Sequence, residues 1–320
     1  MRNITLNTST VSSSRRAACN ATALHFQPVT INAIPEIMRL LPLSRSRAND
    51  FTVGGILMWA DYFDYKYCIY GNTLFIKGVS EMHPGMPAFS LPVGAMPLSC
   101  AVDLIMDYCR VNRVPLRFSA VPDDRIDEVR SIVPGRIERL NDWSDYIYDA
   151  RSLASLAGKK MSKKRNHVNR FMTMNPGYSV ERIDFGNLMD VRRAYIDFLG
   201  RQSVDASSAA EESAQTLSVI ENYGAYPFLG ILLRDDSERI VAFTIGEVIG
   251  DTLYTHIEKM DHEVPGAGET VNKLFAEHII ARYPQVRYIN REEDAGDEGL
   301  RQAKLSYHPA IILNKYDIVV

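Results

Sequence analysis

The sequence has few cysteines and no cysteine pattern. None of them forms a Cys-x-x-Cys pair or has a histidine at the interval of a zinc site, and the four are Cys19, Cys68, Cys100 and Cys109. We therefore expect no bound metal. Reduced thiols packed as small apolar side chains are typical of a cytoplasmic protein, and this is the location that we predict.

Long apolar runs and an excess of one charge are also missing. No run approaches the roughly 20 residues that cross a bilayer, and residues 1–23 lack the apolar core of a secretory signal. Lys and Arg total 36 against 39 Asp and Glu, so contact with a nucleic acid requires a local patch. The pattern Gly-x-Ser-x-Gly is absent, which excludes a serine nucleophile elbow and favours direct transfer chemistry.

The sequence does contain a repeated order of secondary-structure elements, read from its apolar periodicity. The first half predicts a strand (24–32), two helices (33–41, 50–63), three strands (65–70, 73–79, 88–92), a helix (97–112), a strand (114–120), a helix (123–132) and a strand (136–140). The second half predicts a strand (178–184), two helices (187–199, 207–223), a meander (228–234, 240–249, 252–260), a helix (269–283), a strand (286–289), a helix (298–307) and a strand (310–318).

This order is the pattern of the N-acetyltransferase-like (GNAT) fold, whose third helix begins at a phosphate-binding turn. We predict an α+β protein of two tandem GNAT-like domains, each a mixed, mostly antiparallel sheet flanked by helices. The domains are expected at 24–142 and 178–320. Residues 143–177 would connect them, and residues 1–23 would form a mobile tail.

Five separated segments carry a more specific resemblance. They are Asp-Tyr-Ile-Tyr-Asp at 145–149, the basic stretch 158–171, Phe-Thr-Ile-Gly-Glu at 243–247, His-Ile-Glu-Lys at 256–259, and 290–307. In this order they resemble the family of soluble bacterial proteins grouped with the C-terminal catalytic domain of phosphatidylglycerol lysyltransferase. The resemblance covers nearly everything after the tail, and it implies an aminoacyl group as the cargo and tRNA as its carrier. The named enzyme also has a transmembrane half, which these 320 residues lack.

The acid–base candidates lie on the second meander and the last helix. Glu247, His256 and Glu258 fall on adjacent predicted strands, and His256 and Glu258 should share one face because they are two residues apart. Transfer to an amine needs a base for the attacking nitrogen and an acid for the leaving group. By resemblance, Tyr307 takes the place of a tyrosine general acid; the alternative is an aromatic side chain packed on the sheet.

The substrate-binding candidates come from the densely charged stretch 288–309. Asn290 follows a predicted strand, at the end where ligands enter open sheets. We predict that Arg291, Glu292 and Arg301 form the floor of the substrate cavity, with one arginine facing a carboxylate or phosphate. The alternative is a surface network of ion pairs.

A basic segment and a glycine turn concern the donor. The segment 159–170 contains no acidic residue, and we predict that it binds a polyanionic donor such as tRNA through Lys163, Lys164, Arg165 and His167. Gly266 and Gly268 occupy the turn where GNAT enzymes hold coenzyme A. Glu263 and Glu269 flank them and would repel a pyrophosphate, so we expect no cofactor.

The sequence therefore predicts an acyltransferase that moves an aminoacyl group from a donor such as aminoacyl-tRNA to an amine or hydroxyl acceptor, on a lipid headgroup or a small molecule. The equivalent turn of the first domain, 92–96, keeps one glycine, so that domain is expected to be structural. Two alternatives stay open. One is a coenzyme-A-dependent N-acetyltransferase, for which acetyl-CoA would be the cofactor, and the other is a non-catalytic ligand-binding protein on the same fold.

Overall fold

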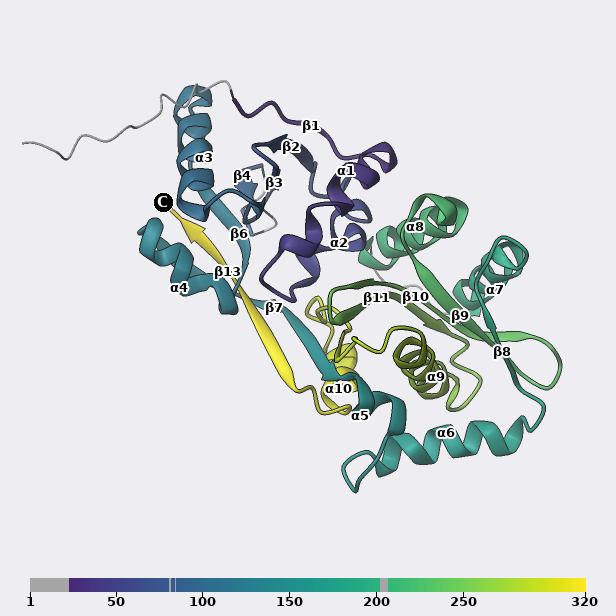
Figure 1. Ribbon diagram of the computed structural model, residues 1–320. Helices are drawn as coiled ribbons and strands as arrows, with labels where there is room; N and C mark the ends of the chain where they lie inside the picture. The colour runs from purple at the N-terminus through teal and green to yellow at the C-terminus, as the bar shows by residue number, and fades with distance from the viewer. Residues whose placement is uncertain (1–22, 81, 84, 202–206) are drawn as a thin grey trace, which may run out of the picture.

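The computed structural model describes residues 23–80, 82–83, 85–201 and 207–320. The predicted tail, apart from residue 23, lies outside these residues. All strands of the described chain belong to one mixed sheet (Figure 1), in the order β1-β2-β3-β4-β6-β13-β7-β12-β11-β10-β9-β8, with β5 paired to β3. Their bounds are β1 Gln27–Pro28, β2 Lys66–Tyr70, β3 Thr73–Val79, β4 Pro87–Phe89, β5 Val93–Gly94, β6 Arg117–Pro122, β7 Arg136–Asp149, β8 Ser179–Arg182, β9 Leu229–Arg234, β10 Ile240–Ile249, β11 Thr252–Met260, β12 Tyr288–Asn290 and β13 Ile311–Val319.

Helices cover both faces of this sheet. The α-helices are α1 Ile34–Met38, α2 Val53–Leu57, α3 Leu98–Asn112, α4 Asp123–Ile132, α5 Ala150–Ser155, α6 Ser162–Met174, α7 Leu188–Arg201, α8 Ser207–Glu221, α9 Ala267–Arg282 and α10 Glu298–Leu305. Short 3-10 helices occur at η1 Ile31–Ala33, η2 Leu41–Leu43, η3 Asn49–Phe51 and η4 Tyr223–Ala225. The predicted α+β class and GNAT-like fold are confirmed.

The last strand joins the two halves of the chain. β13 lies between β6 and β7 and is antiparallel to both, with Ile318 opposite Phe118 on one side and Ile137 on the other. β7 continues past β13 to pair with β12. Since β7 spans 136–149, it crosses the predicted domain boundary at 142 without interruption. The two halves are therefore connected by backbone hydrogen bonds, and the boundaries themselves stay a prediction.

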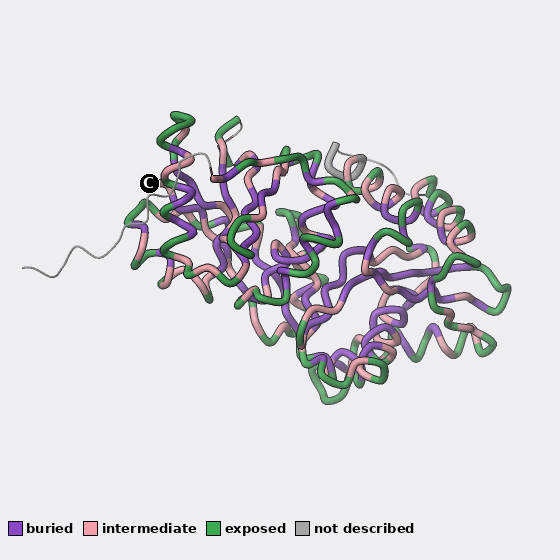
Figure 2. Tube along the Cα trace, turned by 45° about the horizontal axis from the view of Figure 1, so that its top comes forward, coloured by how far each residue is buried: buried purple, intermediate pink, exposed green. Residues whose placement is uncertain are grey.

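The buried residues, purple in Figure 2, run along this sheet, and their apolar side chains form three clusters. One cluster lies around β3, β6, α3 and α4 and includes Leu313 and Ile318 of the last strand, β13. The second packs α5, α6 and α9 on one face of β9–β11. The third is shared, because Val53 and Ile56 of α2 pack in the same core as Ile245 and Ile257 of β10 and β11, together with α7 and α8. The first half thus lies directly on the strands that carry the candidate acid–base residues.

Two predicted elements are wrong. The helix expected over 50–63 is shorter in the structure. It begins after the cap residue Thr52, ends at Leu57 and is followed by turns. Thr52 Oγ1 accepts the N–H of Gly55, and a Cβ on Gly55 would lie 2.2 Å from the Asn49 carbonyl oxygen. The strand expected over 24–32 is reduced to Gln27–Pro28, where proline has no N–H to continue the ladder. Most other elements agree within a few residues.

Candidate active site

The centre of the site is a histidine held between two carboxylates. His256 on β11 is 2.9 Å from Glu247 through Nε2 and 2.7 Å from Glu292 through Nδ1, and its side chain has no exposed area. Burial lowers its pKa, but the hydrogen bonds and charges of both carboxylates outweigh burial and raise the pKa to about 9. His256 is therefore protonated at neutral pH and donates one hydrogen bond to each carboxylate.

Glu247 is held by the first half of the chain. Its Oε1 accepts the backbone N–H of Gly54 in α2 at 2.8 Å, as well as the hydrogen bond from His256. A Cβ on Gly54 would lie 2.4 Å from His256 Nε2. Only glycine fits here, because the backbone of α2 lies against the imidazole ring.

Glu292 forms the accessible end of this chain of groups, with 20% of its side chain exposed. Its backbone is left-handed, with φ of 58°. Such a conformation costs about 1–3 kcal/mol and persists where surrounding contacts enforce it. Here Asn290 Oδ1 accepts the Glu292 N–H at 2.8 Å, while Asn290 Nδ2 donates to Asp145 at 2.9 Å and to the Arg47 carbonyl at 2.8 Å. The carboxylate therefore reaches His256 from a fixed turn.

His256 and Glu258 do not share a face, contrary to the sequence prediction. The pairing of β10 with β11 shifts between Ile245 and Gly246, so that His256 is an extra, bulged residue. After the bulge the alternation is reversed. His256 lies against Gly54 of α2, whereas Glu258 accepts a hydrogen bond from Asn272 of α9 at 3.0 Å.

Arg291 occupies the other side of β11. Its Nη2 lies 2.6 Å from Glu258, and its guanidinium is 4.8 Å from the Tyr307 ring centroid. Burial lowers its pKa, but the Glu258 charge outweighs burial and raises the pKa above its usual value. Its buried Nη1 has no hydrogen-bond partner among the described residues. Because β12 pairs with β11 only as far as Tyr254 and Asn290, the strands diverge there, and Arg291 and Glu292 reach opposite sides of β11.

Tyr307 is packed against aromatic and cationic groups. Its buried ring lies 6.3 Å from the Tyr148 ring in an edge-to-face arrangement, and Lys164 Nζ lies 4.1 Å above it. Burial raises the pKa of Tyr307, so the phenol is neutral at physiological pH. The structure thus brings Tyr307 beside Arg291, in a state that can donate a proton.

Arg301 is not brought to His256. It donates to Asp294 through Nε at 3.0 Å and Nη2 at 2.7 Å, and to Asp142 at 2.8 Å. Tyr146 also donates to Asp294, at 2.5 Å. The Arg301 side chain therefore holds the loop before α10 against β7. This arrangement matches the alternative interpretation of Arg301, a network of ion pairs.

Sequence reasoning missed a second buried group of charges. Lys315 Nζ on β13 lies 2.7 Å from Asp50, 2.8 Å from Asp145 and 3.9 Å from Glu293. Burial raises the pKa of Glu293 to about 7, although Lys315 opposes this. The Asn49 N–H donates to Asp145 at 2.7 Å. No spacing in the sequence could indicate this cluster or the role of Gly54, because the partners come from distant segments.

The basic helix α6 has mixed roles. Lys159, Lys160, Lys163, His167 and Arg170 are exposed. Lys164, in contrast, lies 3.3 Å from Glu269 of α9, and Arg165 donates to the carbonyl oxygens of Leu156 and Gly158, at 3.0 Å for Gly158. The exposed residues can contact a partner, whereas Lys164 and Arg165 hold α6 in place.

The glycine turn before α9 lies against α6. Gly266 has φ of 83° and is buried, and a Cβ there would lie 2.2 Å from the His167 carbonyl oxygen. A Cβ on Gly268 would lie 2.7 Å from Met260 Cε. Both glycines are therefore explained by close packing within the chain.

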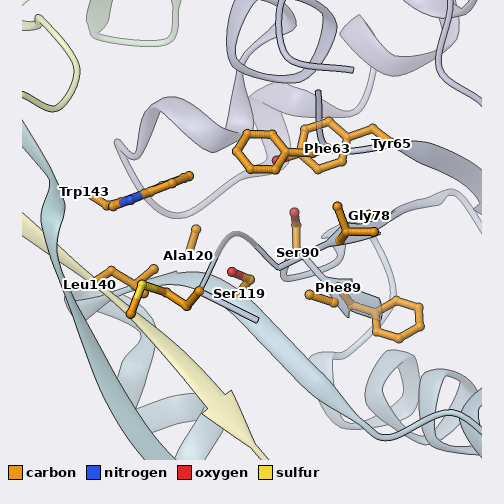
Figure 3. A pocket seen from close by; sticks show the side chains of 12 residues that line it. Phe63, Tyr65, Gly78, Phe89, Ser90, Ser119, Ala120, Leu140 and Trp143 are labelled. Carbon is orange, nitrogen blue, oxygen red and sulfur yellow. The ribbon is translucent and has the colours of Figure 1, made fainter. Parts of the chain in front are cut away.

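A small pocket, of about 20 Å³, lies in the first half (Figure 3). It opens where the parallel strands β4 and β6 diverge after Phe89 and Phe118, and Phe63, Tyr65 and Trp143 line its far side. Among the described residues that line it there is no carboxylate, histidine or lysine. The pocket is thus lined by apolar side chains and by three residues with a hydroxyl group, Tyr65, Ser90 and Ser119, and it is separate from the His256 cluster.

None of the described helices is both long and apolar enough to cross a membrane. A protein of unknown function from Bacteroides thetaiotaomicron has a similar structure, with a TM-score of 0.85 and 28% identity over 93% of this chain and 99% of that one. The L-PGS structure from Bacillus licheniformis matches with a TM-score of 0.60 and 15% identity, over 89% of this chain and 91% of that one, and shows the fold.

An uncharacterised protein of Mycoplasmoides gallisepticum is 21% identical over 248 residues, which are 67% of this chain and 77% of that protein. The family model for the C-terminal domain of phosphatidylglycerol lysyltransferase matches residues 42–319. This range contains the strand exchange, the His256 cluster and the Arg291–Glu258 pair. The chain therefore belongs to the phosphatidylglycerol lysyltransferase C-terminal family, a family of acyltransferases.

Proposed function

We propose that this protein transfers an aminoacyl group from an aminoacyl-tRNA to an amine or hydroxyl acceptor. The observation that carries this proposal is the His256 cluster, in which an imidazolium fixes Glu292 at the opening between diverging strands. Aminoacyl transfer needs a base at the attacking atom, and Glu292 is the one member of the cluster with appreciable exposure.

The bond changes follow from this assignment. The acceptor nitrogen or oxygen attacks the ester carbonyl carbon and gives its proton to Glu292. A new amide or ester bond forms, and the bond from the carbonyl carbon to the ribose oxygen breaks. The ribose oxygen leaves as a hydroxyl after taking a proton, for which the neutral phenol of Tyr307 is a source. Arg291 approaches from the other side of β11, so its unpaired Nη1 can stabilise the negative charge on the carbonyl oxygen when the ester lies in the opening between β11 and β12.

In this scheme His256 and Glu247 are positioning residues. The imidazolium donates to both carboxylates, and Gly54 holds Glu247 from the other half of the chain. The exposed cations of α6 provide a surface for the phosphates of a nucleic-acid donor.

The coenzyme A alternative has less support. The turn that would hold the pyrophosphate lies against the α6 backbone at Gly266. Glu263 and Glu269 add negative charge at the same place. Measurable acetyl transfer would restore this alternative, and binding without any transfer would favour the non-catalytic one.

The test is a transfer assay with tRNA charged with a mixture of radiolabelled amino acids, and with phospholipid vesicles or small amines as acceptors. We expect labelled product with the wild-type protein and a loss of about 10²–10⁴-fold in Glu292→Gln. Glu181→Gln, on the partly exposed strand β8 far along the sheet, is the matched control. Consumption of acetyl-CoA, combined with no transfer from charged tRNA, would overturn the proposal.

A further inference from the structure

A groove of about 320 Å³ lies at the free edge of the sheet, beyond the end of β8. Its walls come from the segment after β8, from η4, from the start of β9 and from the C-terminal turn of α9. Its size is in the range of small-molecule sites. None of the sequence motifs described above falls in this groove.

Three basic side chains converge on the groove. They are Arg182, His278 and Arg282. Burial lowers the pKa of His278, and the charges of Arg182 and Arg282, which line the same groove, lower it further. The carboxylate of Asp184 also lines the groove, although among the described residues it forms no ion pair with either arginine. Clustered guanidinium groups without acidic partners are suited to an anion such as a phosphate.

The groove also presents an aromatic ring to solvent. Phe185 is 79% exposed, and a Cβ on Gly224 would lie 2.6 Å from its Cζ, so the ring rests on the η4 backbone. An exposed ring fixed in this way can stack on a flat partner. Tyr283 of the neighbouring wall lies below Arg282, at 5.6 Å from ring centroid to guanidinium.

The inner wall contains an unsatisfied donor. The Tyr223 hydroxyl is buried and has no hydrogen-bond partner among the described residues, although the residue lines the groove. A buried polar group without a partner is destabilising. A polar atom of a bound molecule would remove this cost.

The groove is also connected to the His256 cluster. Phe228 lines the groove, and its ring lies 5.2 Å from the His256 ring. Phe228 therefore forms part of both the groove wall and the surroundings of His256.

We propose that this groove binds a nucleotide, with its base on Phe185 and its phosphate between Arg182 and Arg282. An anion-binding pair, a fixed exposed ring and an unpaired hydroxyl together match the phosphate, base and polar edge of one nucleotide. The proposal rests on the proposed function only for the source of that nucleotide, which would be the terminal nucleotide of the tRNA donor. A free mononucleotide has the same chemistry.

Calorimetric titration of the wild-type protein with AMP, inorganic phosphate and a short single-stranded RNA tests the proposal at constant salt. We expect AMP to bind more tightly than about 1 mM. The double variant Arg182→Glu, Arg282→Glu should weaken every ligand at least about tenfold. Phe185→Ala should weaken AMP and RNA about tenfold and leave phosphate unchanged, because only the base stacks. Arg130→Glu, an exposed arginine of α4, should change nothing.

Tyr223→Phe is the more discriminating variant. It should weaken AMP several-fold while keeping or raising the melting temperature, because it removes a buried unsatisfied hydroxyl. Phe185→Leu keeps apolar surface, removes the ring and serves if Phe185→Ala folds poorly. If the RNA binds tightly and AMP binds weakly, the groove takes the terminal nucleotide of a tRNA. If the RNA and AMP bind with equal affinity, the groove takes a free nucleotide.

No AMP binding, or binding that these variants leave unchanged, would overturn the proposal. The proposal would also be overturned if phosphate bound as tightly as AMP and if Phe185→Ala had the same AMP affinity as the wild type. The groove would then be an anion site only. These titrations need no acyl transfer, so their failure is distinct from failure of the transfer assay with Glu292→Gln.

Discussion

Gly54 and Glu247 lie 193 residues apart in the sequence and are joined by one hydrogen bond of 2.8 Å. The same glycine leaves space for the His256 ring, which a Cβ would enter at 2.4 Å. A backbone position in the first half thus sets the geometry of an acid–base cluster in the second half. The first half, expected to be structural, contributes in this way to the candidate active site.

Gly54→Ala should disrupt the cluster. The added methyl group would collide with the imidazole, which Glu247 and Glu292 hold in place by hydrogen bonds. We expect a melting temperature lower by several degrees, which corresponds to about 1–3 kcal/mol of overpacking, together with a large loss of transfer.

Gly200→Ala is the control for this substitution. Gly200 lies exposed on α7, and a Cβ there has no atom within 4 Å. Alanine should leave the melting temperature unchanged or raise it slightly, since alanine favours the helix. Equal behaviour of the two variants would contradict the proposed role of Gly54.

The free energy of unfolding should fall as the pH rises from about 6.5 to 9. The folded-state pKa of His256 is raised to about 9, above its ordinary value of 6.5. Its contribution is therefore fully present below pH 6.5 and is lost as pH rises through 9. The effect should be on the order of a few kcal/mol.

Urea denaturation of the wild type and of His256→Gln across this pH range measures the effect. The difference between the two proteins should shrink as the pH rises, because glutamine does not titrate. A difference that does not depend on pH would show that His256 keeps one charge state throughout.

The exposed cations of α6 and of the turn before it should contribute to tRNA binding. Lys159→Glu, Lys160→Glu and Lys163→Glu together should weaken tRNA steeply, and wild-type affinity should fall with added salt. These residues test the surface better than Lys164 and Arg165, which hold α6 through contacts within the chain.

Filter binding across salt concentrations measures this effect. The control combines Arg39→Glu, Arg45→Glu and Arg130→Glu, which make the same change of net charge on exposed positions of the first half. If both triple variants retain tRNA equally well, the basic surface of α6 has no specific role.

Arg301→Ala should lower stability without abolishing transfer. Asp294 is nearly buried and would lose its guanidinium partner, retaining hydrogen bonds from Tyr146 and Gly296. We expect a reduced melting temperature and near-normal transfer well below it. Collapse of transfer at unchanged melting temperature would instead place Arg301 in the substrate cavity, as the sequence predicted.

The local pattern of the sequence was sufficient for most elements and for several site residues. The apolar periodicity that predicted a helix over 97–112 agrees with α3, because residues on one face of a helix recur every three to four positions. The predicted helix 50–63 failed because close backbone contacts at Gly54 and Gly55 decide that segment. The prediction that His256 and Glu258 share a face failed because a β-bulge reverses the alternation of side chains along β11. A bulge depends on the pairing with the partner strand.

The sequence by itself determined the order of elements, the fold class and the identities of Glu247, His256, Arg291 and Glu292 as candidates, because these depend on local spacing and residue chemistry. Only the tertiary structure decided that β13 lies between β6 and β7, that Glu292 reaches His256 from a left-handed turn, and that Gly54 holds Glu247. Those relationships join segments far apart in the chain, and they arise when the two halves close around a shared core and exclude water from the charged groups between them.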